Sequence, residues 1–252
     1  MEQFIRHFIH SILKSNALTN PASPQNGNFV NDEYYNELEY INGSWSWKSV
    51  KRMSTSNLND VIIIVLESPH IDEFSANGTG RYPLFNDVRF NNVFPSLINN
   101  AIHSGLIALN QAITYSVYLM NAVQMQCSLG YPTEYYRDYV FMYYWNKLKT
   151  NFETRLHNMM CSKNVVSVIN LCTLGSHERC SLVYNHHTQK YEYMCKKFGK
   201  KFIQKCKFNT NRKYTLREIV QESIDSKTTN STVLLLGNHP SSLCFNKSLK
   251  SR

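Results

Sequence analysis

Three mostly apolar runs in this chain stop abruptly at, or just before, a polar side chain. Apolar runs of about 4–8 residues are typical of buried β-strands. In open α/β sheets, ligands bind outside the carboxyl ends of the strands, so we expect the three polar groups to meet in one crevice. The runs and their polar residues are 61–66 with Glu67, 114–120 with Asn121, and 232–236 with His239.

The stretches between these runs predict helices. Residues 84–110 carry apolar side chains at i, i+3 and i+4 spacing, and residues 133–160 form a second helical stretch dense in aromatic residues. A further strand is expected at 165–171. Strands joined by helical connections of this length form parallel sheets that are covered on both faces. The predicted fold is therefore α/β, with three layers (α/β/α) and a central, mainly parallel sheet of four strands.

The length of 252 residues suits one large domain, and the hydrophobic content of 42% is that of a globular protein. We expect a single domain over residues 1–252 with two additions to the α/β core. One addition is an N-terminal helical extension over residues 1–50. The other is a basic insertion over about residues 184–217.

The insertion is the most charge-biased part of the chain. The formal net charge of the whole chain is +9, which favours a polyanionic partner. Lysines of the insertion, among them Lys200 and Lys201, are interleaved with aromatic residues, a pattern that suits contact with a nucleic-acid backbone. The alternative is that the aromatic residues anchor this segment to the core while the lysines are only solvated.

Composition excludes several other classes. No run approaches the ~18–20 apolar residues that span a bilayer, and the N-terminal segment lacks the apolar core of a signal peptide. The seven cysteines form no Cys-x-x-Cys pair, which leaves a zinc site or an iron–sulfur cluster without local support. We therefore expect a cytoplasmic monomer with free thiols, without a metal, a cofactor or a membrane partner.

Four short motifs occur in order along the chain, three of them directly after predicted strands. Residues 66–69 (Leu-Glu-Ser-Pro) are similar to a Gly-(Gln/Glu)-x-Pro motif with Leu replacing Gly. Residues 79–85 are similar to a Thr-Gly-Arg-Pro-Phe loop with an extra Tyr, and residues 121–123 (Asn-Ala-Val) to an Asn-Val-Val strand end. Residues 239–243 reproduce His-Pro-Ser-x-Leu. Together these motifs resemble the uracil-DNA glycosylase superfamily, and the loop at 79–85 resembles its thermophilic branch.

The resemblance is confined to the stretches near 61–85, 114–123, 165–175 and 232–243. The four-cysteine cluster of the thermophilic branch is absent, and neither addition to the core has a counterpart in the superfamily. The resemblance implies the fold described above. It also implies an activity in which one nucleotide is flipped out of DNA and its N-glycosidic bond is hydrolysed.

The resemblance implies catalytic roles for three residues. Glu67 would stabilise the sugar cation and orient water, since glycoside hydrolysis needs a carboxylate near the sugar. Ser68 stands where other branches carry Asp or Asn, so either Ser68 or Asp72 would position the water. His239 would donate a hydrogen bond to the base oxygen as charge builds there. Without the family, Glu67 is a surface or helix-capping carboxylate, and His239 is a buried structural histidine.

Further residues would contact the substrate. Asn121 offers a donor and an acceptor that suit one edge of a pyrimidine, although a strand-end cap is the alternative. Tyr82 or Phe85 would stack on the extruded base. His70 stands where the uracil-specific branch has a Tyr that excludes a 5-methyl group, so this pocket would admit a 5-substituted pyrimidine. Contacts with the DNA backbone are implied for Pro69, Ser241, Ser242, Lys200 and Lys201.

The expected function is that of a monofunctional DNA glycosylase, which leaves an abasic site. Its substrate is either a deaminated or damaged base, in repair, or a hypermodified cytosine of phage DNA, in defence. Certain bacterial defence glycosylases that resemble this superfamily remove glucosylated hydroxymethylcytosine, and the altered position of His70 together with the basic insertion favours such a base. The alternatives are a non-catalytic DNA-binding protein that keeps the fold, and a hydrolase of free nucleosides or nucleotides.

Overall fold

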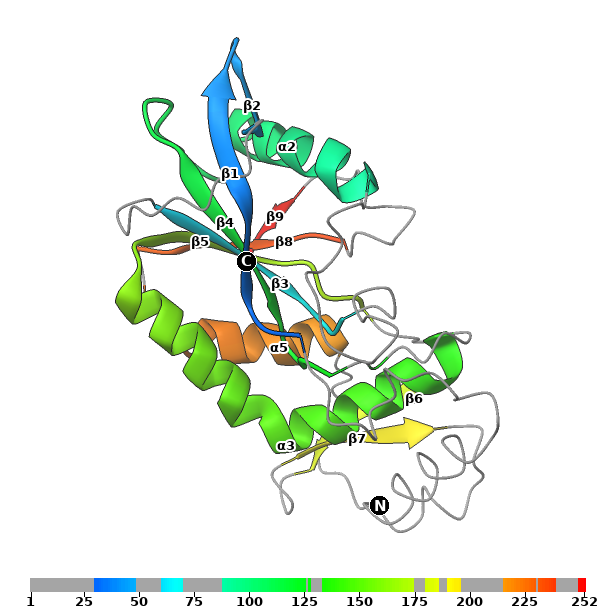
Figure 1. Cartoon of the computed structure of the whole chain (residues 1–252). Helices are drawn as coiled ribbons and strands as arrows, with labels where there is room; N and C mark the ends of the chain where they lie inside the picture. The colour runs from blue at the N-terminus through cyan, green and yellow to red at the C-terminus, as the bar shows by residue number, and fades with distance from the viewer. Residues whose placement is uncertain are drawn as a thin grey trace, which may run out of the picture.

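The computed structural model contains helices and strands that alternate over residues 61–170 (Figure 1). It describes residues 30–48, 60–69, 88–125, 127, 133–174, 180–185, 190–195, 215–229, 231–238 and 249–252. The elements are β1 (Glu33–Ile41), β2 (Ser44–Trp47), β3 (Val61–Leu66), α2 (Val88–His103), β4 (Tyr115–Asn121), α3 (Thr133–Ser162), β5 (Val165–Asn170), β6 (Cys180–Asn185), β7 (Lys190–Cys195), α5 (Leu216–Asp225), β8 (Val233–Leu236) and β9 (Lys250–Ser251).

A mixed sheet of seven strands in the order β2-β1-β4-β3-β5-β8-β9 forms the centre of the molecule (Figure 1). The strands β4, β3, β5 and β8 are parallel to one another, and they are the four strands expected from the sequence. The α/β class is therefore confirmed. The expected sheet of four strands is wrong, because β1, β2 and β9 pair in antiparallel fashion and extend the sheet at both edges.

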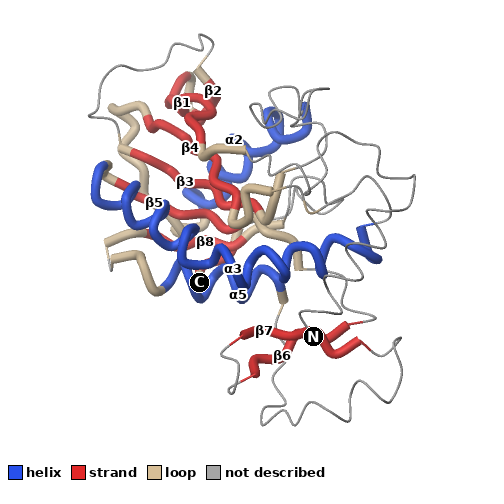
Figure 2. The backbone as a smooth tube through the Cα atoms, turned by 60° about the horizontal axis from the view of Figure 1, so that its bottom comes forward, coloured by secondary structure: helices blue, strands red, loops and turns tan. Residues whose placement is uncertain are grey.

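Helices cover both faces of this sheet. Figures 1 and 2 show α2 on one face and α3 with α5 on the other. Ile64 of β3 belongs to an apolar cluster that contains Phe94 of α2. Its neighbour Ile63 belongs to a second cluster, which contains Phe152 of α3 and Val220 of α5. Because β3 is buried on both faces, it is a continuous apolar run instead of an alternating one, which is why the sequence predicts its bounds correctly.

The N-terminal extension is not helical where the structure describes it. Residues 33–41 and 44–47 are the strands β1 and β2, and β1 pairs with β4 at the edge of the parallel strands. The sequence does not predict β1 because two of its buried positions, Asn36 and Glu37, are polar. The Glu37 carboxylate is paired with Lys48 Nζ at 2.5 Å, which compensates its burial. Residues 1–29, 49 and 50 of the expected extension lie outside the described residues.

The end of β6, the whole of β7 and the start of α5 are described within the expected basic insertion. The antiparallel strands β6 and β7 form a separate two-stranded sheet that lies beside α3 (Figures 1 and 2). Residue 217 belongs to α5, whose N-cap Thr215 and Glu218 form a capping box. The apolar side of α5 packs against the parallel strands, and Arg217 lies in the first turn of this helix. Lys200 and Lys201 lie outside the described residues.

Gly237 follows β8 at a point where no side chain fits without displacement. A Cβ atom there would lie 2.5 Å from Leu171 Cδ2 and 2.7 Å from Leu249 Cδ2. Both leucines are buried, so we expect Gly237→Ala to lower the free energy of unfolding by about 1–3 kcal/mol. Urea denaturation measures this loss. In a Leu249→Ala background the same change should cost less, because one clash is gone. Wild-type stability of Gly237→Ala would contradict the close packing.

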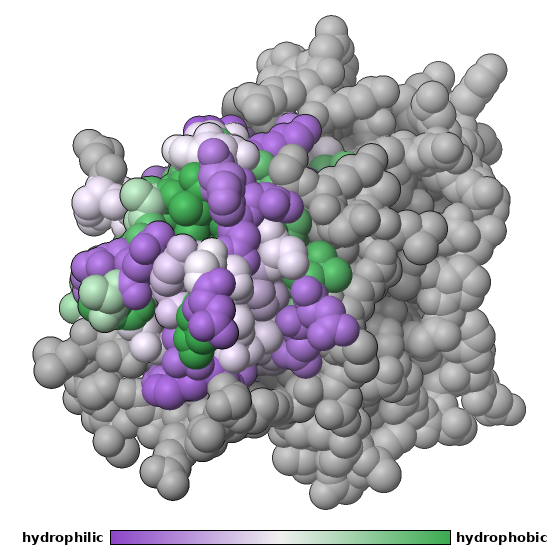
Figure 3. All heavy atoms as spheres, turned by 90° about the horizontal axis from the view of Figure 1, so that it is seen from above, coloured by the Kyte–Doolittle hydropathy of each residue, from purple (hydrophilic) through white to green (hydrophobic). Residues whose placement is uncertain are grey.

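The described surface is mostly hydrophilic on the face that Figure 3 shows, where apolar residues are interspersed among polar ones. Large apolar side chains exposed in the described ranges are Ile41, Ile113 and Leu174. No helix among the described residues is both long and apolar enough to cross a membrane.

Candidate functional site

The carboxyl ends of the four parallel strands lie at one edge of the sheet, which we call the carboxyl edge. Leu66 of β3 is in register with Asn121 of β4, and Val65 of β3 is in register with Asn170 of β5. Asn170 is in turn in register with Leu236 of β8. The residues that follow these positions therefore meet at the same edge, as parallel strands require.

Glu67 is a buried carboxylate at this edge, with only 4% of its surface exposed. Its Oε2 accepts a hydrogen bond from the backbone N–H of Thr173 at 3.0 Å. Its own backbone oxygen accepts from the N–H of Val123 at 2.9 Å. Glu67 thus lies between the segments that follow β4 and β5. The interpretation of Glu67 as a surface carboxylate is therefore wrong.

Arg217 and Cys172 lie in the electrostatic field of Glu67. Burial lowers the pKa of Arg217, and the nearby Glu67 carboxylate acts in the opposite direction. Burial, reinforced by Glu67, raises the pKa of the Cys172 thiol well above its ordinary value. Cys172 is therefore a neutral thiol at physiological pH, and it is unsuited to act as a nucleophile. Arg217 is held by its Nε, which donates to the Cys172 carbonyl at 2.8 Å.

Asn170 fixes α5 to the end of β5. Its side chain is fully buried, and Nδ2 donates to Gln221 Oε1 at 2.9 Å and to the Arg217 carbonyl at 3.2 Å. Its Oδ1 accepts from the N–H of Cys172 at 3.0 Å. All these partners lie within the α5 layer or the turn after β5. Asn170 therefore determines where the first turn of α5 meets the carboxyl edge.

Asn121 closes β4 with a buried carboxamide. Its side chain has 2% of its surface exposed, and its Oδ1 has no hydrogen-bond partner in the described part of the chain. The Oγ1 of Thr173 is likewise buried without a described partner. Buried acceptors are normally satisfied, so such atoms at a sheet edge are suited to a ligand donor. Because Asn121 is in register with Leu66, its side chain lies on the same face of the sheet as Leu66, the face that α2 covers. A ligand in contact with both Asn121 and Glu67 would therefore reach across the carboxyl edge.

Arg155 of α3 holds the backbone of Asn121 in place. Its Nη2 donates to the Asn121 carbonyl at 2.9 Å, and its Nη1 donates to both carboxylate oxygens of Asp32. The two side chains are only 16% and 10% exposed. This pair links the residue before β1, the C-terminal half of α3 and the end of β4.

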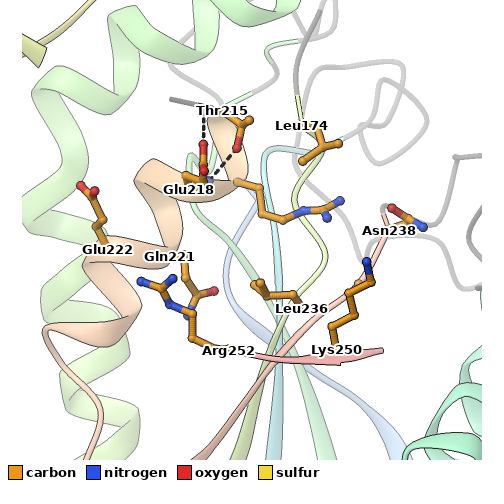
Figure 4. Close-up of a pocket in the computed structure, with 11 residues that line it drawn as sticks. Leu174, Thr215, Glu218, Gln221, Glu222, Leu236, Asn238, Lys250 and Arg252 are labelled. Atoms are coloured by element: carbon orange, nitrogen blue, oxygen red, sulfur yellow. Dashed lines mark hydrogen bonds between the residues drawn. The ribbon is translucent and has the colours of Figure 1, made fainter. Parts of the chain in front are cut away.

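A cavity of about 680 Å³ lies on the α5 side of the carboxyl edge (Figure 4). Its walls come from the turn after β5, from α5, from the end of β8 and from β9. The close-up shows Lys250 pointing toward Asn238, with Leu236 lining the wall beside them. The lining residues are Leu174, Thr215, Arg217, Glu218, Gln221, Glu222, Leu236, Gly237, Asn238, Lys250 and Arg252.

The structure describes only some of the site residues that the sequence predicts. Glu67, Ser68 and Pro69 follow β3 as buried residues, and Asn121 ends the neighbouring strand. His239 comes directly after Asn238, and the preceding Gly237 N–H donates to the Asn170 carbonyl at 3.0 Å. The chain therefore enters the last motif from the carboxyl edge. The nominated residues outside the described ranges are His70, Asp72, Tyr82, Phe85, Lys200, Lys201, His239, Ser241 and Ser242.

Three residues at this edge were missed by sequence reasoning, namely Asn170, Thr173 and Arg217. Asn170 had a signal, since it ends an apolar strand in the same way as Asn121. Thr173 and Arg217 had none, because their positions follow from the turn after β5 and from the docking of α5.

No group of three or more His, Cys, Asp or Glu residues within the described ranges is arranged to hold a metal ion. Comparisons with protein-family models, with curated proteins and with solved structures found no match to this chain.

Proposed function

We propose that this protein is a DNA glycosylase, which flips a modified or damaged pyrimidine out of DNA and hydrolyses its N-glycosidic bond. One observation carries the proposal. A buried carboxylate, Glu67, and a buried carboxamide, Asn121, end adjacent parallel strands at the edge from which the chain runs on to His239. This arrangement agrees with the order of the four motifs that resemble the uracil-DNA glycosylase superfamily.

The state of these two side chains supports the proposal. Because the N–H of Thr173 holds one oxygen of Glu67, the carboxylate keeps a fixed orientation before substrate binds. Asn121 presents a buried acceptor without a described partner, and a base edge would supply the missing donor. Burying such groups without a ligand costs stability, which is typical of sites that are organised for binding.

The proposed reaction breaks the bond between C1′ of the sugar and the ring nitrogen of the base. Positive charge develops on the sugar, and Glu67 would stabilise this charge and orient the attacking water, with Ser68 or Asp72 as the water-positioning residue. The base leaves as an anion, which a hydrogen bond from His239 would stabilise until the base takes up a proton. The water oxygen adds to C1′ and loses its proton, so the products are a free base and an abasic site in the DNA.

The base we propose is a hypermodified cytosine, such as glucosylated hydroxymethylcytosine of phage DNA. His70 replaces the Tyr that would exclude a 5-substituent, and the lysines of the insertion, including Lys200 and Lys201, suit a DNA backbone. We propose DNA as the partner of a monomeric enzyme that acts without a cofactor. Repair of uracil or of another deaminated base is the competing role.

A panel of oligonucleotides tests the proposal. Separate duplexes and single strands carry uracil, mismatched thymine, hypoxanthine, hydroxymethylcytosine or its glucosylated form, and alkali then cleaves any abasic site. We expect scission at the glucosylated base. Scission at uracil alone would assign repair instead. Binding of these oligonucleotides without any scission would indicate a non-catalytic DNA-binding protein, and release of bases from free nucleosides alone would indicate a nucleoside hydrolase.

A further inference from the structure

The cavity beside α5 is lined by basic side chains from two elements that are far apart in the sequence. Arg217 comes from the first turn of α5, and Lys250 comes from β9. We propose that this cavity binds a phosphoryl group carried by a nucleoside, either in a free nucleotide or in a polynucleotide strand. The inference goes beyond the proposed base excision and does not depend on it.

The terminal nitrogens of Arg217 have no described acceptor. Its Nε is used by the Cys172 carbonyl, and no ion pair of Arg217 occurs among the described residues. A half-buried guanidinium has lost part of its hydration, and burial accordingly lowers its pKa. A phosphoryl group would restore these interactions, because the planar guanidinium matches two of its oxygens.

Lys250 supplies a second positive charge to the same cavity. Figure 4 shows its side chain directed toward the amide of Asn238. In the described part of the chain, its ammonium group has no carboxylate within ion-pair distance. Arg217, Lys250 and the Asn238 carboxamide therefore line one space, which suits an anion with several oxygens more than a single carboxylate.

The acidic residues of the cavity are engaged elsewhere. Glu218 Oε2 accepts from the Thr215 N–H at 2.7 Å in the capping box. Arg252 donates to Asp225 at 2.7 and 2.9 Å, and Glu222 and Glu218 lie within its field and contribute to its raised pKa. The acids of the cavity wall thus act on Arg252, whereas the carboxylate that acts on Arg217 is Glu67, which is not part of the cavity lining. The positive end of α5 adds to the attraction for an anion.

The remaining wall of the cavity suits a nucleoside. Leu236 lines it, and Leu174 stands at its rim with 44% of its surface exposed. Apolar side chains next to a few polar groups are typical of ligand cavities, and a volume of about 680 Å³ lies in their usual range. A sugar and base would therefore cover the leucines while the phosphoryl group meets the cations.

Calorimetric titration of the full chain tests the proposal with four probes. These are inorganic phosphate, thymidine 5′-monophosphate, thymidine, and a ten-residue thymidylate that lacks a terminal phosphate. Binding of the monophosphate would assign a free nucleotide or a strand terminus, and binding of the thymidylate alone would assign an internal phosphodiester. Either result supports the site provided that thymidine does not bind. Equal binding of thymidine, or binding of no probe, would overturn it.

A pair of charge-matched variants separates the site from the general positive charge of the chain. Lys250→Gln should weaken binding of the phosphorylated probe about tenfold, since a charge-assisted hydrogen bond is lost. Lys227→Gln removes the same charge from a lysine that lies just after the end of α5 and pairs with Glu153. Binding in this variant should stay within about twofold of the wild type. Lys250 is exposed on a two-residue strand, so its replacement leaves the core intact. Equal losses in the two variants would refute a specific site.

Discussion

Glu67→Gln is expected to lower the rate of base excision by a factor of about 10²–10³ while DNA affinity stays within about twofold. The glutamine side chain has the same shape and keeps an oxygen that can accept from the Thr173 N–H. It loses the negative charge that would stabilise the sugar cation. Single-turnover excision with excess enzyme measures the chemical step, and fluorescence anisotropy with the same oligonucleotide measures binding.

Glu39→Gln provides the matched control for this result. Glu39 follows Leu38 on β1, and Leu38 pairs with Tyr115 at the start of β4. Glu39 therefore lies near the amino ends of the parallel strands, whereas Glu67 lies at their carboxyl ends. The substitution is chemically identical, so excision should remain within about twofold of the wild-type rate. Full activity of Glu67→Gln would remove the carboxylate from the mechanism. Equal loss in both variants would show that the effect is not local.

Arg155→Ala is expected to lower the free energy of unfolding by about 3 kcal/mol, because Asp32 would remain as a largely buried charge without its partner. The change also removes the donor to the Asn121 carbonyl. Lys149→Ala on the same helix removes the exposed partner of an i,i+4 pair with the half-buried Glu153, which keeps Lys227 as a second partner, and should cost less than about 0.5 kcal/mol. Urea denaturation measures both losses.

The pH dependence of the Arg155→Ala variant follows from the carboxyl of Asp32. Burial raises the pKa of Asp32, although Arg155 opposes this shift. Without Arg155 the folded-state pKa should rise further above the unfolded value. A raised pKa means that stability is retained at low pH and lost as pH rises through the folded-state pKa. The deficit should therefore be larger at about pH 7 than at about pH 4. In an Asp32→Asn background it should be smaller at both values and nearly independent of pH.

The parallel strands could be predicted because each is a buried apolar run. Val61–Leu66 has apolar neighbours on both faces, so its sequence needs no alternation and its ends are visible. The direction of such strands then implies that Glu67 and Asn121 reach one edge, as the register of β3 and β4 demonstrates. This part of the candidate site follows from the sequence by topology alone.

The remaining elements were hidden by local composition. The start of α5 was not predicted, because this stretch was assigned to the basic insertion. Thr215 and Glu218 form a capping box there, and Ser/Thr-x-x-Glu before an apolar run signals a helix start. In β1 the buried Glu37 resembles a surface residue until its pairing with Lys48 is known. The positions of Thr173 and Arg217 depend on how the layers dock, which no local pattern encodes.

The shortness of β9 has a consequence for the lifetime of any complex in the α5 cavity. Only two register pairs, Leu235 with Ser251 and Leu236 with Lys250, join this strand to β8. Such an edge can detach by local opening long before the sheet unfolds, so Lys250 would leave and return on its own timescale. A bound molecule that uses Lys250 would slow the exchange of the nearby backbone amide hydrogens with solvent deuterium. Occupancy of the cavity would then be visible in β9, a strand that carries none of the residues proposed to act on the sugar.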